Sequence, residues 1–209
     1  MSAFFRVPSS ILISNGKALN VMLKRLISNW VYGGFLAGIL ILCLTPVLAR
    51  GWPNALLATF LCLPVYMLHQ YEEHDNDRFR AFVNRLLGRG REALTPLAVF
   101  ITNIIGVWAV LGAAFCLAAC LNGGYGLIAA YLLLLNAVIH IAQAITARGY
   151  NPGLVTAIVL FLPAGGYCLR AVMAGGSGTP TMHVIGAAVA IGVHAAIAGQ
   201  VLRNRNPRS

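Results

Sequence analysis

The residues of this chain that could perform chemistry are concentrated in one short stretch. Four of its five acidic residues and two of its five histidines lie within residues 69–77. If the helix before this stretch continues through it, His69, Glu72 and Glu73 occupy positions i, i+3 and i+4 and share one helix face. One imidazole and two carboxylates on a single face are typical of a divalent metal site or an acid–base site. We therefore predict that Glu72 and Glu73 are catalytic.

The composition places this stretch in a membrane protein. Of the 209 residues, 59% are hydrophobic and 10% are charged, whereas soluble globular domains have about 25% charged residues. The apolar runs are long enough to cross a bilayer, so the expected fold is an all-α, polytopic membrane helix bundle. The net charge of +10 does not indicate a nucleic-acid partner, because no basic stretch is interleaved with stacking aromatic residues. The five cysteines form no CxxC pair and are interpreted as small buried hydrophobic residues.

About six helices are expected to cross the bilayer, and all of them belong to a single bundle at residues 31–202. Glycine, proline and asparagine mark the turns between them. The polar segment 74–94 is long enough to form a further short helix. The predicted spans are residues 31–49, 53–73, 95–120, 126–147, 153–173 and 181–202.

Both ends of the chain are expected to lie outside the bilayer. Residues 1–30 form an N-terminal segment, in which residues 17–30 have the spacing of an amphipathic helix on the membrane surface. Residues 203–209 form a basic tail. With six spans, every basic residue except Arg50 and Arg170 falls on one side of the membrane. The positive-inside rule makes this side cytoplasmic and places both termini there, in what we predict to be the bacterial inner membrane.

The same topology brings polar residues of other spans to the depth of this stretch. Asn136, His140 and Gln143 occupy positions i, i+4 and i+7 of the fourth span and form one polar stripe. Polar groups are costly in hydrocarbon, so these side chains should face one another inside the bundle. His74 lies off the shared face and is expected to be solvated. The predicted metal ligands are His69, Glu72, Glu73, His140 and His194, and the predicted substrate-binding residues are Asn136, Gln143 and Tyr150.

The ligand types narrow the choice of metal. Imidazole and carboxylate groups suit Zn, Fe or Mn, and no thiolate is expected near the site. Two ions would need six or more ligands, and the supply of such residues is short. A single divalent metal with an open position is therefore the preferred interpretation.

Three motifs, taken in order, make the chain resemble the HXXEE-domain integral membrane proteins. They are His69-Gln70-Tyr71-Glu72-Glu73, a separate His140, and Tyr150-Asn151-Pro152-Gly153, which resembles the YxPG motif of that family. The resemblance covers about residues 56–175. It supports the site but implies no reaction, because the family as a whole has no established one. Physically, the third motif is interpreted as a tight turn that holds Tyr150 at the cytoplasmic interface.

The sequence leaves three classes of function open. The first is a metal-dependent enzyme, either a hydrolase or a non-haem iron oxidoreductase, that acts on a lipid or a hydrophobic small molecule. In the hydrolytic version one of Glu72 and Glu73 binds the metal and the other is the general base, and in the oxidative version both bind iron. The alternatives are a proton- or cation-coupled carrier and a membrane assembly partner without catalysis. The absence of an inverted repeat argues against a carrier, and the lipid bilayer is the one partner that the sequence predicts.

Overall fold

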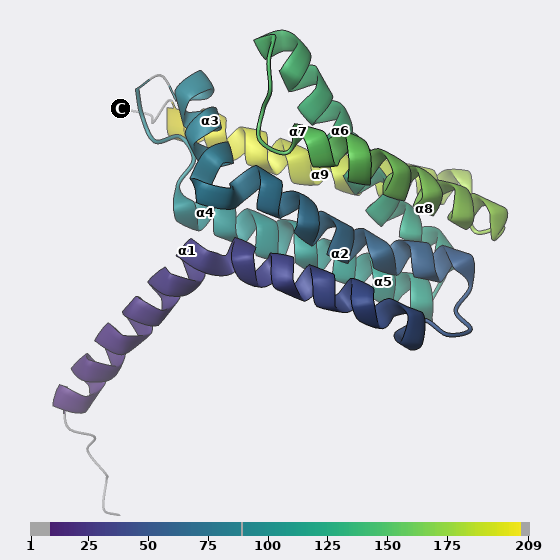
Figure 1. Ribbon diagram of the computed structural model, residues 1–209, viewed down its shortest axis with the longest axis horizontal. Helices are drawn as coiled ribbons and strands as arrows, with labels where there is room; N and C mark the ends of the chain where they lie inside the picture. Colours follow the sequence, from purple (N-terminus) through teal and green to yellow (C-terminus); the bar gives the residue numbers. More distant parts are fainter. Residues whose placement is uncertain (1–8, 89, 206–209) are drawn as a thin grey trace, which may run out of the picture.

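The chain folds as a bundle of helices. A computed structural model describes residues 9–88 and 90–205, and these residues form helices and turns but no strand. Figure 1 shows the long helices side by side, as expected for a polytopic membrane protein whose backbone groups must be satisfied within each span. Residues 1–8 of the predicted N-terminal segment and residues 206–209 of the predicted basic tail lie outside the described residues.

Five helical segments of the described chain are long and apolar enough to cross a membrane, which indicates an integral membrane protein. A sixth long helix, α2 (Asn54–His74), lies among them, and the polar residues 69–74 in its last turns lower its hydropathy. Apart from the first, the predicted spans agree with these helices to within a few residues, while the orientation in the membrane stays a prediction. The five apolar segments are Leu19–Leu48, Pro96–Cys120, Gly123–Ala147, Leu154–Ala174 and Pro180–Arg205.

The first helix differs from the prediction. The sequence predicts a surface helix at 17–30 and a separate span at 31–49, but α1 (Ser9–Leu48) is one continuous helix of 40 residues. No proline separates the two segments, and the helix continues through the Gly33-Gly34 pair near their junction. Figure 1 shows the N-terminal part of α1 leaving the bundle at an angle, while the remainder lies along α2. The position of that first part at the membrane surface stays a prediction.

Two of the spans contain a π-helical segment. One span consists of α4 (Pro96–Ile101), the π-helix η2 (Thr102–Trp108) and α5 (Ala109–Cys120). Another consists of α7 (Leu154–Thr156), the π-helix η4 (Ala157–Phe161) and α8 (Leu162–Ala174). A π-helical turn shifts the side chains that follow it around the helix and is frequent at functional sites. Both segments contact the histidines described below.

Helix α6 (Gly126–Ala147) lies at the centre of the bundle, in contact with α2, α5, α8 and α9 (Pro180–Arg205). Small residues such as Ala129 on its buried face are fully enclosed. Small residues allow helices in lipid to approach closely, and this contact stabilises the bundle. The buried residues of α6 also include Asn136 and His140, so the helix presents these two polar side chains to the interior.

A short amphipathic helix covers one end of the bundle. After α2 the chain makes one turn, η1 (Asp75–Asp77), and continues into α3 (Arg78–Leu87). The extra helix predicted within residues 74–94 is thereby confirmed. Phe82 and Val83 of α3 are buried in a hydrophobic cluster with Val201 near the end of α9. Helices α2, α3 and α9 therefore enclose the same end of the molecule.

Candidate metal centre

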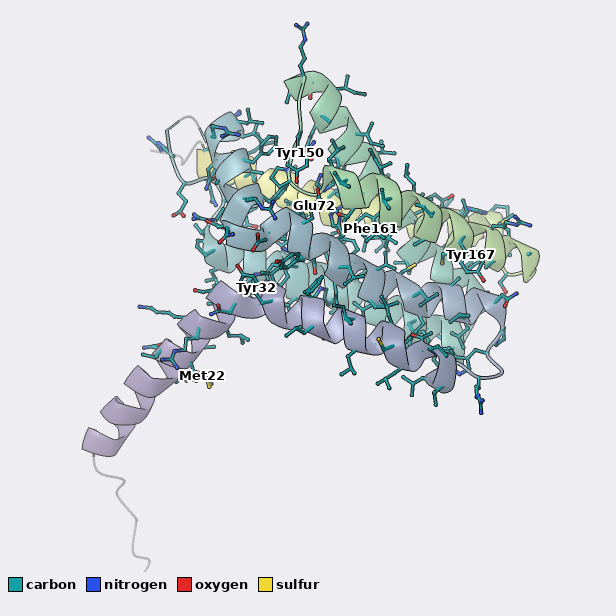
Figure 2. The ribbon with its side chains drawn as sticks, in the orientation of Figure 1. Met22, Tyr32, Glu72, Tyr150, Phe161 and Tyr167 are labelled. Atoms are coloured by element: carbon teal, nitrogen blue, oxygen red, sulfur yellow. The ribbon has the colours of Figure 1, made fainter. Side chains whose placement is uncertain are left out.

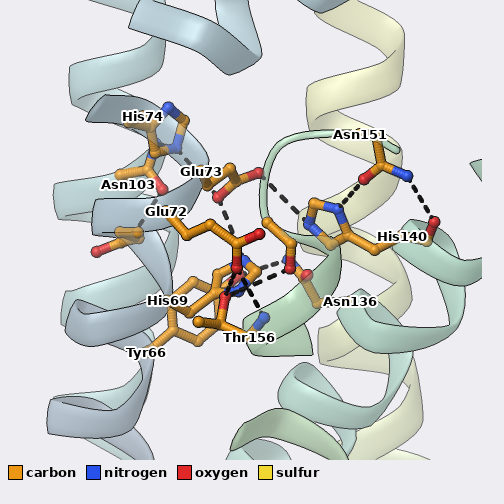
Figure 3. Close-up of polar contacts among 12 residues, drawn as sticks. Tyr66, His69, Glu72, Glu73, His74, Asn103, Asn136, His140, Asn151 and Thr156 are labelled. Carbon is orange, nitrogen blue, oxygen red and sulfur yellow. Dashed lines mark hydrogen bonds and ion pairs between the residues drawn. The ribbon is translucent and has the colours of Figure 1, made fainter. Parts of the chain in front are cut away.

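The end of α2 and the middle of α6 bring one carboxylate and two imidazoles together. His69 and Glu73 are one turn apart on α2, and α6 supplies His140. One ligand atom of each residue lies within 4.8 Å of the other two. Glu73 Oε2 is 3.5 Å from His69 Nε2, and Glu73 Oε1 is 3.6 Å from His140 Nε2. All three residues are buried, and Figure 3 shows the carboxylate reaching both rings.

Asn151 determines the tautomer of His140. The amide nitrogen of Asn151 donates to the backbone oxygen of His140 at 2.8 Å, so Asn151 Oδ1 faces His140 Nδ1, at 2.7 Å. A carboxamide oxygen can only accept, and the neutral imidazole must therefore carry its proton on Nδ1. The lone pair of His140 is then on Nε2, the nitrogen that faces Glu73.

Thr156 determines the tautomer of His69 in the same way (Figure 3). The Thr156 hydroxyl is 2.5 Å from Glu72 Oε2 and donates its single proton there, because an ionised carboxylate only accepts. Thr156 Oγ1 therefore accepts from His69 Nδ1, at 2.8 Å. The lone pair of neutral His69 is again on Nε2, toward Glu73.

Two imidazole lone pairs and an anionic carboxylate thus face one another in a buried space. His69 Nε2 has no hydrogen-bond partner within the described part of the chain. These electron-pair donors repel one another unless a cation lies between them, and they are ligands that Zn, Fe and Mn accept. Tetrahedral coordination with bonds of about 2.1 Å places ligand atoms roughly 3.4 Å apart. Glu73 is 3.5 and 3.6 Å from the two rings through different carboxylate oxygens, and one ligand atom of each residue lies within 4.8 Å of the other two, so binding a single ion would draw the three groups slightly closer together.

Glu72 lies outside this group, although the sequence predicts it as a ligand and a catalytic residue. One residue step turns a side chain by about 100° around a helix, so Glu72 faces the start of α7 and not His140. Its carboxylate accepts from the backbone N–H groups of Val155 and Thr156, at 3.2 and 2.7 Å, and from the Tyr150 hydroxyl at 2.9 Å. The structure therefore gives Glu72 the contacts of a helix cap, a favourable place for a carboxylate.

Tyr150 lies beside Glu72 and does not line the cavity described below. Figure 2 shows the two side chains close together near the start of α7. Partial burial raises the pKa of Tyr150, and the hydrogen bond to the Glu72 carboxylate raises it further. The predicted contact of Tyr150 with a substrate is untested. The contact that the structure shows is with Glu72, which also bonds to Thr156.

The turn before α7 touches both ligand rings through Gly153. This residue has a φ of 96°, which glycine adopts without strain. A Cβ at this position would lie 2.7 Å from His140 Cε1 and 2.9 Å from His69 Cε1. The tight turn predicted for residues 150–153 therefore does more than connect two spans. Its backbone packs against the rings that its Asn151 side chain and the following Thr156 orient.

Asn151, Gly153 and Thr156 contact the ligands, but spacing along the helices does not reveal them as part of the site. Asn151 and Gly153 do belong to the third motif of the sequence, and their residue types could have indicated contact with the site. An asparagine can both donate and accept, and a glycine allows close backbone approach. Thr156 offers no such signal, because a threonine in an apolar span usually bonds to its own helix backbone.

His74 is buried, so the expectation that it is solvated is wrong. Its ring lies 5.2 Å from that of Trp30, and 8% of the residue is exposed. The contact comes from α1, which packs Trp30 against the end of α2, and spacing within α2 cannot reveal it. His74 Nε2 is 3.2 Å from Glu73 Oε2 and 3.3 Å from Asn103 Nδ2.

A directed chain of hydrogen bonds leads from Trp108 through Gln70 to Asn103, beside His74. Trp108 Nε1 can only donate, and it bonds to Gln70 Oε1 at 2.6 Å. Gln70 Nε2 then donates to Asn103 Oδ1 at 2.7 Å, which leaves the Asn103 amide nitrogen toward His74. One nitrogen cannot both accept from Asn103 and donate to Glu73, so His74 bonds to the Glu73 carboxylate only when it carries a proton on Nε2. The Asn103 amide nitrogen then keeps its bond to the Val99 backbone oxygen, at 2.9 Å.

A cavity of about 310 Å³ lies beside two of the three candidate ligands. Glu73 and His140 line it, so an ion bound to them would be reached from this space. Small-molecule sites have volumes of about 300–1,000 Å³ and mostly apolar walls with a few polar groups. Apolar side chains of α3, α4, α6 and α9 dominate this wall. Its remaining polar members are Tyr66, His74, Thr102, Asn103, Asn136, Gln143 and His194.

His194 belongs to the cavity wall and not to the ligand group. Its Nδ1 is 2.8 Å from the backbone oxygen of Ala190, one turn earlier on α9. Within residues 9–88 and 90–205, the group that could hold a metal consists of His69, Glu73 and His140. The structure therefore brings together three of the five predicted ligands and leaves Glu72 and His194 beside them.

Comparison with protein families gives a match to the central part of the chain. A family model described as "Protein of unknown function with HXXEE motif" matches residues 60–168, more than half of the chain. All three motifs singled out in the sequence lie within this range. No curated protein and no solved structure matches the chain.

Proposed function

The chain belongs to the HXXEE family, whose function is unknown, and from its site we propose that it is a metal-dependent membrane enzyme. His69, Glu73 and His140 would hold one divalent ion, and the adjacent cavity would bind a lipid or a hydrophobic small molecule. One observation carries the proposal. Two imidazole Nε2 lone pairs and one carboxylate point at a common buried position, and hydrogen bonds on the far side of each ring fix this arrangement.

The ligand set suits Zn, Fe or Mn. Two histidines and one carboxylate with an open position occur both in zinc hydrolases and in non-haem iron oxygenases. Zinc would supply Lewis acidity for hydrolysis, whereas iron would supply redox chemistry with dioxygen. The identity of the metal therefore separates the two reaction classes.

The residues around the ligands have distinct positioning roles in this proposal. Asn151 and Thr156 keep the two imidazoles in the tautomers that can bind a metal. Glu72 holds Thr156 through its hydroxyl and its backbone N–H. His74 contacts the second side of the Glu73 carboxylate, which restricts its rotation. Removing an outer contact of this kind typically lowers metal affinity about 10- to 100-fold.

The wall of the cavity supports a hydrophobic substrate. Val83 and Leu87 of α3 and Val201 and Leu202 of α9 line it. Burying hydrocarbon against such a surface is favourable, and it also excludes water from the metal ligands.

The proposal is tested by the metal content of protein purified in detergent. Wild-type protein should contain close to one equivalent of metal, and His140→Ala and Glu73→Gln should lose it. His183→Ala is the matched control, because His183 lies near the start of α9 and bonds to the Tyr131 hydroxyl, away from the ligand group. This variant should keep its metal.

Each outcome bears on a stated part of the proposal. Zinc lost in the two ligand variants alone would indicate a hydrolase, and iron lost in the same way would indicate an oxygen-using enzyme. Wild-type protein that binds no metal, even after incubation with zinc, iron(II) and manganese(II), would contradict the proposal. A carrier or an assembly partner would then be the better account.

A further inference from the structure

We propose that the ligand of this cavity is an uncharged hydrophobic molecule with two hydroxyl groups, one bound by Gln143 and the other by Asn136. This inference rests on the proposed function, because it names the class of substrate that the enzyme would take. It comes from polar atoms of the cavity wall that the metal ligands do not use.

Two buried oxygen atoms in the wall lack hydrogen-bond donors. Gln143 Oε1 and Asn136 Oδ1 have no partner among the residues that the structure describes. Both residues line the cavity. A buried acceptor without a donor is unfavourable, because it has lost its bonds to water. A ligand that donates hydrogen bonds would satisfy both atoms once their amide groups, whose oxygens are almost completely buried, turn toward the cavity.

The Asn136 end also offers a donor. The Asn136 amide nitrogen donates to the Tyr66 hydroxyl oxygen at 2.7 Å, and this leaves the Tyr66 proton free for another acceptor. Tyr66 also lines the cavity (Figure 3 shows both side chains). A hydroxyl group can accept from Tyr66 and donate to Asn136 through one oxygen, so it matches this pair.

The two acceptors lie on either side of His140. Asn136, His140 and Gln143 follow one another along α6, and a separation of seven residues corresponds to about 10 Å along the helix. A ligand bound at both points would therefore extend along α6. Its central part would pass the Nε2 atom of His140 and the Glu73 carboxylate, where the metal is proposed to bind.

The charges of the site disfavour an ionic ligand. A carboxylate or phosphate has no proton to donate to the two acceptors. An ammonium group could donate to both oxygens and would be attracted by the Glu73 carboxylate, but burying its charge against this mostly apolar wall is costly. Hydroxyl groups on an apolar body avoid both problems.

The test compares three probes that differ only in their hydrogen-bond donors: octane-1,8-diol, its monomethyl ether and its dimethyl ether. The extended diol has about the separation of the two acceptors. Equilibrium dialysis against protein in lipid nanodiscs, with empty nanodiscs subtracted, measures binding to metal-free and zinc-loaded protein. Each methylation should weaken binding about 2- to 10-fold, the effect of one hydrogen bond.

Two variants connect this preference to the named residues. Gln143→Met should weaken diol binding by the same factor as one methylation, and it should leave binding of the dimethyl ether unchanged. Asn136→Leu should act in the same way at the other end. Thr146→Val, on the exposed face of α6, is the control and should bind all three probes like the wild type. Gln143→Met should also melt no earlier than the wild type, because it removes an acceptor that has no partner.

Equal affinity for the diol and the dimethyl ether, or no binding of the diol above empty nanodiscs, would overturn this inference. An early-melting Gln143→Met protein with an unchanged probe preference would overturn it too, since Gln143 would then be structural. If the protein binds zinc but binds the three probes equally, only the proposed dihydroxy ligand is rejected, and the proposed enzyme stands. If the protein prefers the diol but never binds a metal, the metal-dependent enzyme is rejected and the proposed dihydroxy ligand stands.

Discussion

Replacing Gly153 by alanine should weaken metal binding by displacing both ligand rings. The new Cβ would lie 2.7 Å from His140 Cε1 and 2.9 Å from His69 Cε1, whereas carbon atoms in contact are about 3.5–4.0 Å apart. Overpacking of this kind costs about 1–3 kcal/mol. If the rings move away to relieve it, zinc affinity falls about 5- to 150-fold, because each 1.4 kcal/mol is roughly a factor of ten. The φ of 96° costs the alanine a further 1–2 kcal/mol, approximately, in folding stability.

Zinc affinity is measured by competition with a chelator in detergent, and the melting temperature is recorded on the same protein. Gly176→Ala is the matched control, because Gly176 has a φ of 74° but a Cβ there meets no atom within 4 Å. The control should lose stability through its backbone alone and keep wild-type zinc affinity. Wild-type affinity in Gly153→Ala would refute the claim that this turn positions the ligands. Equal losses of affinity in both variants would attribute the effect to general destabilisation.

Three further predictions address the residues around the ligands. Asn151→Leu should lower zinc affinity about 10–100-fold in the same competition assay, and Asn151→Asp, which can still accept from His140 Nδ1, should lose less; the opposite order would contradict the tautomer assignment. Glu73→Gln should abolish zinc binding while Glu72→Gln only weakens it, and equal loss in both would restore Glu72 as a ligand. Because the folded-state pKa of Tyr150 is raised, its stabilising contribution is complete below the unfolded value of about 10 and is lost as pH rises through the folded value. The melting temperature should therefore fall more steeply above pH 10 in wild type than in Tyr150→Phe, and parallel curves would contradict the Tyr150–Glu72 contact.

The position of the site could be predicted because it depends on regular geometry. Helical spacing places His69 and Glu73 on one face of α2, and the order of the spans places His140 at the same depth. The span boundaries follow from runs of apolar residues and from the turns between them. These features need no knowledge of which helices are neighbours.

The roles of individual residues depend on contacts between helices, and spacing does not determine these contacts. Glu72 and Glu73 are adjacent and chemically identical. Only the turn before α7, which bonds to Glu72, distinguishes the residue that caps a helix from the candidate metal ligand Glu73. His74 is buried because α1 packs Trp30 against it. The continuity of α1 was missed for a different reason, since an amphipathic pattern predicts a face and not the end of a helix.

The most direct test of the central claim is the X-ray absorption spectrum of the metal-loaded protein. We predict a first shell of nitrogen and oxygen atoms, with the multiple-scattering signal of two imidazoles and one carboxylate, and no bound metal to give this spectrum in His140→Ala. A shell that contains sulfur, or a spectrum unchanged in His140→Ala, would contradict the assignment of His69, Glu73 and His140 as the metal ligands.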